Sequence, residues 1–417
     1  MCKEEKTMTQ RLAILGLTVI FVTGSAVAGD SPQFRGPNRD GIFSEQGLMK
    51  TWPEGGPAVA WVAKGLGGGY SSVSVVDGKV YAAGMGAEET GMVTVLNAAD
   101  GKVEKVIRYG KETTNDQAPG PRSTPSIDGK RLYLMSGLGV VYCVDLVKNN
   151  VAWSVDVLKK FGAENNTWTL AESLLVDGDR VICTPGGVEG GVVALNKVNG
   201  ETVWATKGIN DKASYCSPAI VTHNGHRILL TETETLVVGV NPDNGALLWT
   251  HPHKTEYNIH AVTPIYSNGL VYYSGGYGSG GGVLELSPDG TAVTLKWEDK
   301  KLDCQHHGVV LVDGYLYGTG HKNNQLVCLE MATGKLMWQS KEVRQGATAY
   351  SDGMFYVYEG PKAGAMDLVK VSPAGMELAG RFSVTEGEGN HWAHPVIANG
   401  VLYIRHGDAL IAYKITQ

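Results

Sequence analysis

The chain has 417 residues and a mild charge, with 36 basic against 42 acidic residues and a net charge of −6. No basic run stands out, which excludes an obvious nucleic-acid-binding surface. The 56 glycines are about twice the typical share and sit at turns, so they indicate tight hairpins and not a flexible linker.

The first 28 residues have the pattern of an export signal. Lys3, Lys6 and Arg11 precede an apolar run from Leu12 to Val22, and Ala26-Val27-Ala28 supplies the small-x-small cleavage pattern. The apolar run is too short to cross a bilayer comfortably. We therefore expect cleavage near Ala28 and a periplasmic or secreted protein with no membrane span.

A hairpin signature returns eight times along the rest of the chain. Each copy is a run of β-forming residues, then Asp-Gly or Asn-Gly, then another such run. The pairs are Asp77-Gly78, Asp128-Gly129, Asp177-Gly178, Asn224-Gly225, Asn268-Gly269, Asp313-Gly314, Asp352-Gly353 and Asn399-Gly400. Their spacing of 39 to 51 residues is typical of the blades of a β-propeller.

The copy around Asp313-Gly314 shows the four strands of one blade most clearly. The pair predicts a two-residue turn, because Asp or Asn followed by Gly adopts positive φ at least cost. The strands are expected at Val309 to Val312, Tyr315 to Tyr317, Gln325 to Glu330 and Lys335 to Trp338.

Five tryptophans recur at one place in the fourth strand, namely Trp153, Trp204, Trp249, Trp297 and Trp338. We interpret them as rings wedged between neighbouring blades, where each buries a large apolar area. Packing between repeats requires a large side chain at the same position of each repeat. An aromatic binding platform is the alternative interpretation of the same residues.

The two ends of the chain determine the number of blades. The last repeat stops after its third strand, whereas Ala58 to Ala63, with Trp61, forms an isolated strand ahead of the first hairpin. Donating that strand to the last blade closes the ring and removes two open edges. The sequence thus predicts an all-β, eight-bladed propeller of four-stranded antiparallel blades over residues 57–417, with residues 29–56 as an extension over its outside or one face. Seven blades plus a separate hairpin are the alternative.

Five cysteines follow residue 28, at Cys143, Cys183, Cys216, Cys304 and Cys328. None belongs to a C-x-x-C pair, which argues against a zinc site or a thioredoxin-type centre. Cys143 and Cys328 occupy equivalent positions in apolar strands and are expected to be buried. An odd number in an oxidising compartment allows two disulfides and one free thiol, with the pairing open.

The segment from Leu329 to Trp338, LEMATGKLMW, resembles the tryptophan-docking repeat of the pyrroloquinoline quinone (PQQ) dehydrogenase superfamily. The whole of 57–417 is similar to the smaller PQQ-like propellers, which include BamB-like assembly factors. The opening FRGPNRDG at 34–41, followed by GYSS at 69–72, resembles exported PQQ-like repeat proteins of unassigned function. The resemblance implies the fold but not the function, because the superfamily includes enzymes and scaffolds.

The sequence departs from the enzymes of this superfamily in ways that affect the cofactor. Their adjacent cysteine pair is absent, and their calcium ligands and catalytic Asp match no motif here. PQQ with calcium therefore remains a possible cofactor without the support of a cysteine pair. The departure from BamB-like lipoproteins is that no cysteine stands at the end of the N-terminal apolar run to carry a lipid.

In a four-stranded blade, the loops between blades and those joining strands two and three emerge on one face. Seven of the eleven histidines map to these loops. The candidate ligand-binding residues are Tyr70, Arg122, Trp168, Glu172, Tyr215, His260, His306, His307, His391, Trp392 and His394, with His321, His406 and Asn258 on the same face. They either hydrogen-bond neighbouring loops or line a pocket at the channel mouth.

Patterns that carry catalysis are weak. His306 and His307 with His394 offer imidazole ligands for a divalent metal, although adjacent residues of a strand point in opposite directions. Neither a phosphate-binding loop nor a G-x-S-x-G motif occurs. No catalytic residue is assigned.

Three functions follow from this pattern. The first is an exported, non-enzymatic propeller that binds a protein, a peptide or a glycan through its histidine-rich face. The second is a PQQ- or metal-dependent oxidoreductase that uses the same face. The third is a BamB-like envelope assembly subunit that needs no small ligand.

Overall fold

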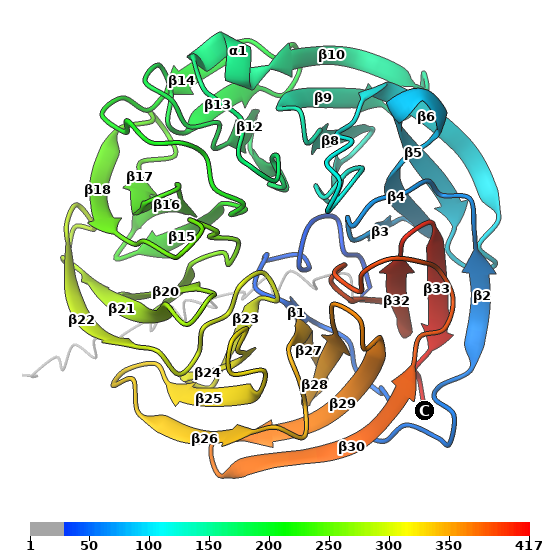
Figure 1. The fold of residues 1–417 in the computed structure, drawn as a ribbon. Helices are drawn as coiled ribbons and strands as arrows, with labels where there is room; N and C mark the ends of the chain where they lie inside the picture. Colours follow the sequence, from blue (N-terminus) through cyan, green and yellow to red (C-terminus); the bar gives the residue numbers. More distant parts are fainter. Residues whose placement is uncertain (1–28) are drawn as a thin grey trace, which may run out of the picture.

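The structure is a computed structural model that describes residues 29–417, and strands predominate in it (Figure 1). Eight sheets, each with four antiparallel strands, follow one another around a ring, and one of them gains a fifth, parallel strand. The expected signal at 1–28 lies outside the described residues. None of the described helices is long and apolar enough to cross a membrane.

The first seven blades each use four consecutive strands, from the channel outward. Blade one comprises β3 (Ser74–Val76), β4 (Lys79–Met85), β5 (Thr90–Asn97) and β6 (Val103–Lys111), and blade two comprises β7 (Ser126–Asp128), β8 (Arg131–Met135), β9 (Val140–Asp145) and β10 (Asn150–Asp156). Blade three comprises β11 (Leu175–Asp177), β12 (Arg180–Cys183), β13 (Val193–Asn196) and β14 (Thr202–Ala205). Blade four comprises β15 (Ala219–His223), β16 (His226–Glu232), β17 (Leu236–Val240) and β18 (Leu247–Pro252). Blade five comprises β19 (Ile265–Ser267), β20 (Leu270–Gly275), β21 (Gly280–Leu286) and β22 (Val293–Asp299). Blade six comprises β23 (Val309–Val312), β24 (Tyr315–Thr319), β25 (Leu326–Glu330) and β26 (Leu336–Ser340). Blade seven comprises β27 (Gly346–Ser351), β28 (Met354–Glu359), β29 (Ala365–Ser372) and β30 (Gly375–Ser383). Two short helices, η1 (Ala87–Glu89) and α1 (Val157–Phe161), interrupt the described strands.

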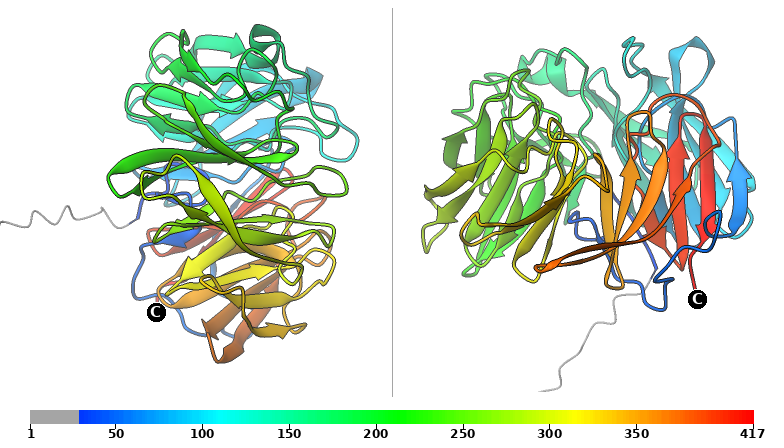
Figure 2. Two further views of the ribbon diagram at one scale, coloured as in Figure 1. Left: turned by 90° about the vertical axis from the view of Figure 1, so that its left-hand side faces the viewer. Right: turned by 60° about the horizontal axis from the view of Figure 1, so that its bottom comes forward.

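The eighth blade confirms the predicted closure. It consists of β31 (Val396–Ala398), β32 (Val401–His406), β33 (Ala409–Lys414) and the N-terminal β2 (Val59–Ala63), which pairs antiparallel with β33. The right view of Figure 2 shows the blue β2 beside the red strands. The Trp61 indole N–H donates to the Ala98 carbonyl of blade one at 2.9 Å. The seven-bladed alternative is therefore wrong.

The hairpin turns follow the predicted chemistry in six blades, where both turn residues have positive φ, as at Asp313 (49°) and Gly314 (85°). Blades two and three differ. Asp128 pairs with Arg131, so the turn is Gly129-Lys130, and Asp177 pairs with Arg180 in the same way. In both hairpins the Asp therefore belongs to the strand, and of the two turn residues only the glycine, at the first turn position, has positive φ.

The repeated tryptophans pack between blades, as predicted. The Trp204 indole N–H donates to the Pro242 carbonyl of the next blade at 3.0 Å. The ring covers Gly245, where a Cβ atom would lie 2.6 Å from it. The same contact recurs for Trp61 on Gly101, Trp153 on Gly200 and Trp297 on Gly334. These four rings thus require a glycine in the turn of the following blade.

The extension lies partly inside the channel, as the blue loop in the centre of Figure 1 shows. Arg39 donates to the carbonyls of Ser173 and Leu174 in blade three, at 2.6 and 3.0 Å. Arg35 donates to the Val309 carbonyl of blade six at 2.7 Å. The placement expected from sequence, over the outside or one face, is therefore wrong for residues 33–41.

The extension then leaves the channel along the seventh blade. Strand β1 (Ile42–Phe43) pairs in parallel with β27, the innermost strand of that blade. Trp52 packs farther out against Tyr356 and Phe382, with ring centroids 5.9 and 5.8 Å away. From there the chain enters β2 and closes the ring.

All five cysteines of the described residues are buried and free. The two disulfides that their number allowed are therefore not formed. Cys143 and Cys328 lie inside β9 and β25 with no exposed surface, as their apolar context indicated. They serve as small core side chains.

Candidate ligand pocket at the channel mouth

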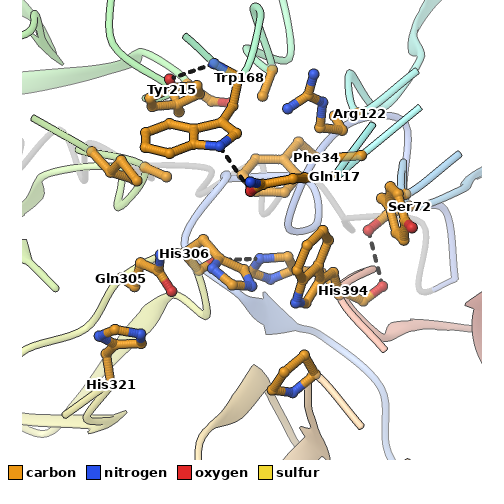
Figure 3. Close-up of a pocket in the computed structure, with 18 of the residues that line it drawn as sticks. Phe34, Ser72, Gln117, Arg122, Trp168, Tyr215, Gln305, His306, His321 and His394 are labelled. Atoms are coloured by element: carbon orange, nitrogen blue, oxygen red, sulfur yellow. Dashed lines mark hydrogen bonds between the residues drawn. The ribbon is translucent and has the colours of Figure 1, made fainter. Parts of the chain in front are cut away.

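A pocket of about 380 Å³ lies at the mouth of the channel (Figure 3). Loops from most of the blades and the tip of the extension contribute to it. Its aromatic lining residues are Phe34, Tyr70, Trp168, Tyr215, Tyr277 and Trp392. Such a concave, mainly apolar site with a few polar groups is the usual form of a ligand pocket.

Trp168 is held in place from two sides. Its indole N–H donates to the side-chain oxygen of Gln117 at 2.9 Å, and its backbone N–H donates to the Tyr215 hydroxyl at 3.3 Å. Tyr257 meets the indole edge to face at 6.1 Å between centroids. Figure 3 shows the indole facing the middle of the pocket. This rigid, half-buried ring offers contact area at a low entropic cost.

The part of the extension that lies in the channel, residues 33–41, forms the floor of the pocket together with His306 and His394. The Phe34 ring meets that of His394 edge to face at 5.0 Å. His394 Nε2 donates to the His306 carbonyl at 2.9 Å, while Nδ1 lies 3.5 Å from an Arg35 guanidinium nitrogen. Both nitrogens of His394 are thus engaged within the protein. The pocket is closed below by residues that also hold the extension.

The two histidines of the floor carry no charge at physiological pH. Burial lowers the pKa of His306 to about 4. Burial and the neighbouring Arg35 hold the pKa of His394 well below its ordinary value. Both imidazoles are therefore uncharged.

Arg122 is the one permanently charged side chain among the lining residues, which include no carboxylate. Burial lowers its pKa to about 10, so it remains protonated, and it donates to the Thr169 hydroxyl. The other polar groups are neutral amides and hydroxyls, including Gln117, Gln305 and Gln345. The chemistry of the pocket suits a neutral ligand with apolar faces.

Most of the predicted site residues meet in this pocket. They are Tyr70, Arg122, Trp168, Tyr215, His306, Trp392 and His394, together with His321. Tyr70 and Trp392 form one wall, with their ring centroids 4.9 Å apart. The rule that assigned loops to one face found this set because a propeller brings all of these loops to the same mouth.

Four predicted residues do not line the pocket. Glu172 accepts from the Thr184 backbone N–H at 2.8 Å, and burial raises its pKa to about 8. His391 stacks on His406 at 3.8 Å. His307 is buried beside His306 at 4.2 Å between centroids, and His260 packs against Glu232. Their loops were placed correctly, but their side chains turn into the blades.

The sequence prediction missed several lining residues. Phe34 belongs to a motif noted in the sequence, but the extension was not expected in the channel. Tyr277 and Gln305 occupy loops of the predicted face and could have been found by applying the same rule to every aromatic and amide residue. Gln117 was missed because nothing local marks one glutamine of a long loop as inward-facing.

A metal on His306, His307 and His394 does not fit these contacts, since both His394 nitrogens already have partners. Among the residues from 29 onward, the one group of three metal-type side chains lies elsewhere, at Glu232, His253 and His260.

A family model described as "Outer membrane protein assembly factor BamB" (PQQ_2) matches residues 111–340, more than half of the chain. The chain belongs to this PQQ-like propeller family. Among curated proteins, the outer membrane protein assembly factor BamB of Moranella endobia (strain PCIT) is 25% identical over 262 residues, which is 62% of this chain and 54% of that relative. This PQQ-like propeller thus spans about half the length of the relative it matches.

Solved structures share the fold of this PQQ-like propeller. BamB from Moraxella catarrhalis has a TM-score of 0.62 at 14% identity, covering 86% of this chain and 100% of that one. The quinohemoprotein alcohol dehydrogenase from Comamonas testosteroni has a TM-score of 0.67 at 12% identity, and the match covers 92% of this chain and 80% of that one. At such identities the likeness shows the fold alone.

The lining residues of this PQQ-like propeller do not fit a calcium-bound quinone. Calcium takes six to eight oxygen ligands, typically including carboxylates. The pocket supplies no carboxylate, and Arg122 alone would face the several acidic groups of PQQ. We therefore derive no chemistry through this cofactor.

Proposed function

We propose that this PQQ-like propeller is a non-enzymatic binding protein that takes a neutral, partly apolar peptide segment of a partner protein into the channel-mouth pocket. The observation that carries the proposal is the concave pocket with six aromatic residues and a single cation. Aromatic side chains in a desolvated, rigid pocket supply most of the energy of peptide recognition.

The comparisons support a protein partner. The matching family model and the curated relative are both described as an outer membrane protein assembly factor. A periplasmic or secreted location and a role in envelope assembly are proposals for this chain on the same ground.

A neutral glycan is the second candidate ligand. Gln117, Gln305 and Gln345 offer amide donors and acceptors around the aromatic walls, with Ser72 and Ser217 hydroxyls between them. Sugar hydroxyls pair with such neutral groups, and the apolar faces of sugar rings pack on aromatic rings.

The test is a titration followed by tryptophan fluorescence and calorimetry. Neutral peptides rich in aromatic and aliphatic residues form one panel, and neutral oligosaccharides form the other. We expect saturable binding from the peptide panel, and a weaker affinity in Trp168→Phe, which removes the indole N–H that holds the ring to Gln117.

The matched control is Trp338→Phe, which changes an indole in the outermost strand of blade six, away from the pocket. It should bind like the wild type. Binding by oligosaccharides alone would favour the glycan. Saturable uptake of PQQ with calcium, together with alcohol-dependent dye reduction, would replace the proposal with an oxidoreductase.

A further inference from the structure

A second cluster of polar side chains lies in blade four and the loop that leaves it. Glu232 ends β16, His253 follows β18, and His260 precedes β19. Glu232 and His260 have no exposed surface, and His253 retains 8%. One ligand atom from each lies within 4.8 Å of the others. None of the three residues lines the channel-mouth pocket.

The hydrogen bonds of His260 determine its tautomer. Nε2 lies 3.1 Å from the Glu234 carbonyl oxygen, which can only accept, so Nε2 carries the proton. Nδ1 therefore presents a lone pair, 3.5 Å from a carboxylate oxygen of Glu232. Nδ1 has no hydrogen-bond partner, and neither has the other Glu232 oxygen, Oε1.

Unpartnered acceptors are costly in a buried site. A buried polar atom without a partner is destabilising, and most buried polar atoms have one. Here two acceptors without hydrogen, His260 Nδ1 and Glu232 Oε1, share one buried cluster. A cation bound between His260 Nδ1 and the Glu232 carboxylate would supply a partner for these acceptor groups.

The cluster is also held in position by its surroundings. The Ser214 hydroxyl lies 2.9 Å from the Glu232 carbonyl oxygen and 2.8 Å from that of His260, which ties the two backbones together. Histidines that bind metals typically donate their second nitrogen to a carbonyl or carboxylate, as His260 does. His253 Nδ1 lies 2.7 Å from Glu232 Oε2 and completes the set.

We propose that Glu232, His253 and His260 bind one divalent first-row transition metal ion, with zinc as the ion best suited to two imidazoles and a carboxylate. Such nitrogen and oxygen ligands favour zinc and its neighbours over calcium or magnesium. On binding, the metal displaces the proton shared by His253 Nδ1 and Glu232 Oε2, which leaves to solvent.

The proposed metal site includes His260, whose loop also contributes residues to the channel-mouth pocket. Ile259 and Ala261, on either side of His260, both line the channel-mouth pocket. A metal joining His260 to the end of β16 would hold these two residues in place. The metal proposal nevertheless stands on its own contacts and does not depend on the proposed peptide binding.

The test is a titration of the protein with cobalt and zinc after treatment with a chelator and its removal by dialysis. We expect one equivalent of Co²⁺ with visible absorption bands of a low-coordinate site, displacement of Co²⁺ by Zn²⁺, and a rise in Tm on Zn²⁺ addition. Glu232→Gln and His260→Gln should each lower the affinity by more than about 100-fold, since they remove a direct ligand.

His223→Gln is the matched control, because His223 is a buried histidine bonded to the Tyr266 hydroxyl and the Ser287 carbonyl, outside the cluster. It should bind like the wild type. The alternative to a bound metal is a protonated Glu232, since burial raises the pKa of this carboxyl to about 8.

Substoichiometric cobalt in the wild type, equal affinity in Glu232→Gln, or a loss in His223→Gln would each overturn the metal site. Should Glu232→Gln not fold, the wild-type titration decides the matter, because a Tm unmoved by zinc contradicts the proposal.

Discussion

Tryptophans occupy two regions of this propeller and have a different role in each. In the outer strands, Trp204 is 8% exposed and lies on Gly245 of the next blade. At the channel mouth, Trp168 and Trp392 are half-buried, and both line the pocket. The outer rings recur with the repeat, whereas the mouth rings occur in loops that differ from blade to blade.

The difference shows how a repeat separates packing from recognition. A residue that recurs at one blade position meets a requirement that every blade has, namely contact with its neighbour. A residue in one loop alone is free of that requirement and is available for a ligand. Residue type by itself does not distinguish the two uses.

Trp204→Ala should give the largest effect. Truncation of a buried aromatic side chain costs about 3–5 kcal/mol of unfolding free energy. Chemical denaturation measures the loss, and ligand affinity of the folded fraction should stay unchanged. A stable variant with impaired binding would assign the outer ring to recognition.

Gly245→Ala tests the partner of the same ring. A Cβ atom on Gly245 (φ 77°) would lie 2.6 Å from the Trp204 ring, while one on Gly225 (φ 84°) would face open space. Both substitutions place alanine at positive φ, at about 1–2 kcal/mol. The clash should cost Gly245→Ala about 1–3 kcal/mol more than Gly225→Ala, which is typical of overpacking. Equal losses in denaturation would show that the ring does not need the glycine.

Trp168→Ala should have the reverse effect to Trp204→Ala. Ligand affinity should fall roughly tenfold or more, since a rigid aromatic anchor contributes above about 1.4 kcal/mol. The Tm should change little, because the ring is half-buried. A large fall in Tm would place Trp168 with the packing residues instead. His394→Ala is not a clean probe of this kind, because its imidazole bonds to the His306 carbonyl beneath the pocket.

Glu172→Gln should give an effect whose size depends on pH. Burial raises the pKa of Glu172 in the folded state from 4.5 to about 8. Wild-type stability is therefore lost as the pH rises through this window, whereas glutamine does not titrate. The Tm advantage of the variant should grow between about pH 5 and pH 8.5. A difference independent of pH would show that Glu172 does not ionise in this range.

Much of the fold was predictable because its signals are local. Asp313-Gly314 determines its own turn, and Trp61 lies in a strand that lacks a partner nearby in sequence. The register of blades two and three was not predicted, since their Asp-Gly pair lies one position earlier relative to the strands, so that Asp128 and Asp177 pair within the sheet and only the glycine enters the turn.

The candidate site was predictable only in part. Loop positions placed Trp168 and His306 at the mouth, but not the direction of each side chain. Glu172 and His391 lie in loops of the same face and point into the blades, where packing and hydrogen bonds decide their orientation.

The sequence by itself determined the eight-bladed ring and its closure, because turn chemistry, strand alternation and tryptophan spacing act over a few residues. Only the tertiary structure decided that Arg35 and Arg39 plug the channel, that Phe34 forms a pocket floor, and that Glu232 meets His253 and His260. These contacts join residues far apart in the chain or depend on how a loop folds, so no local pattern encodes them.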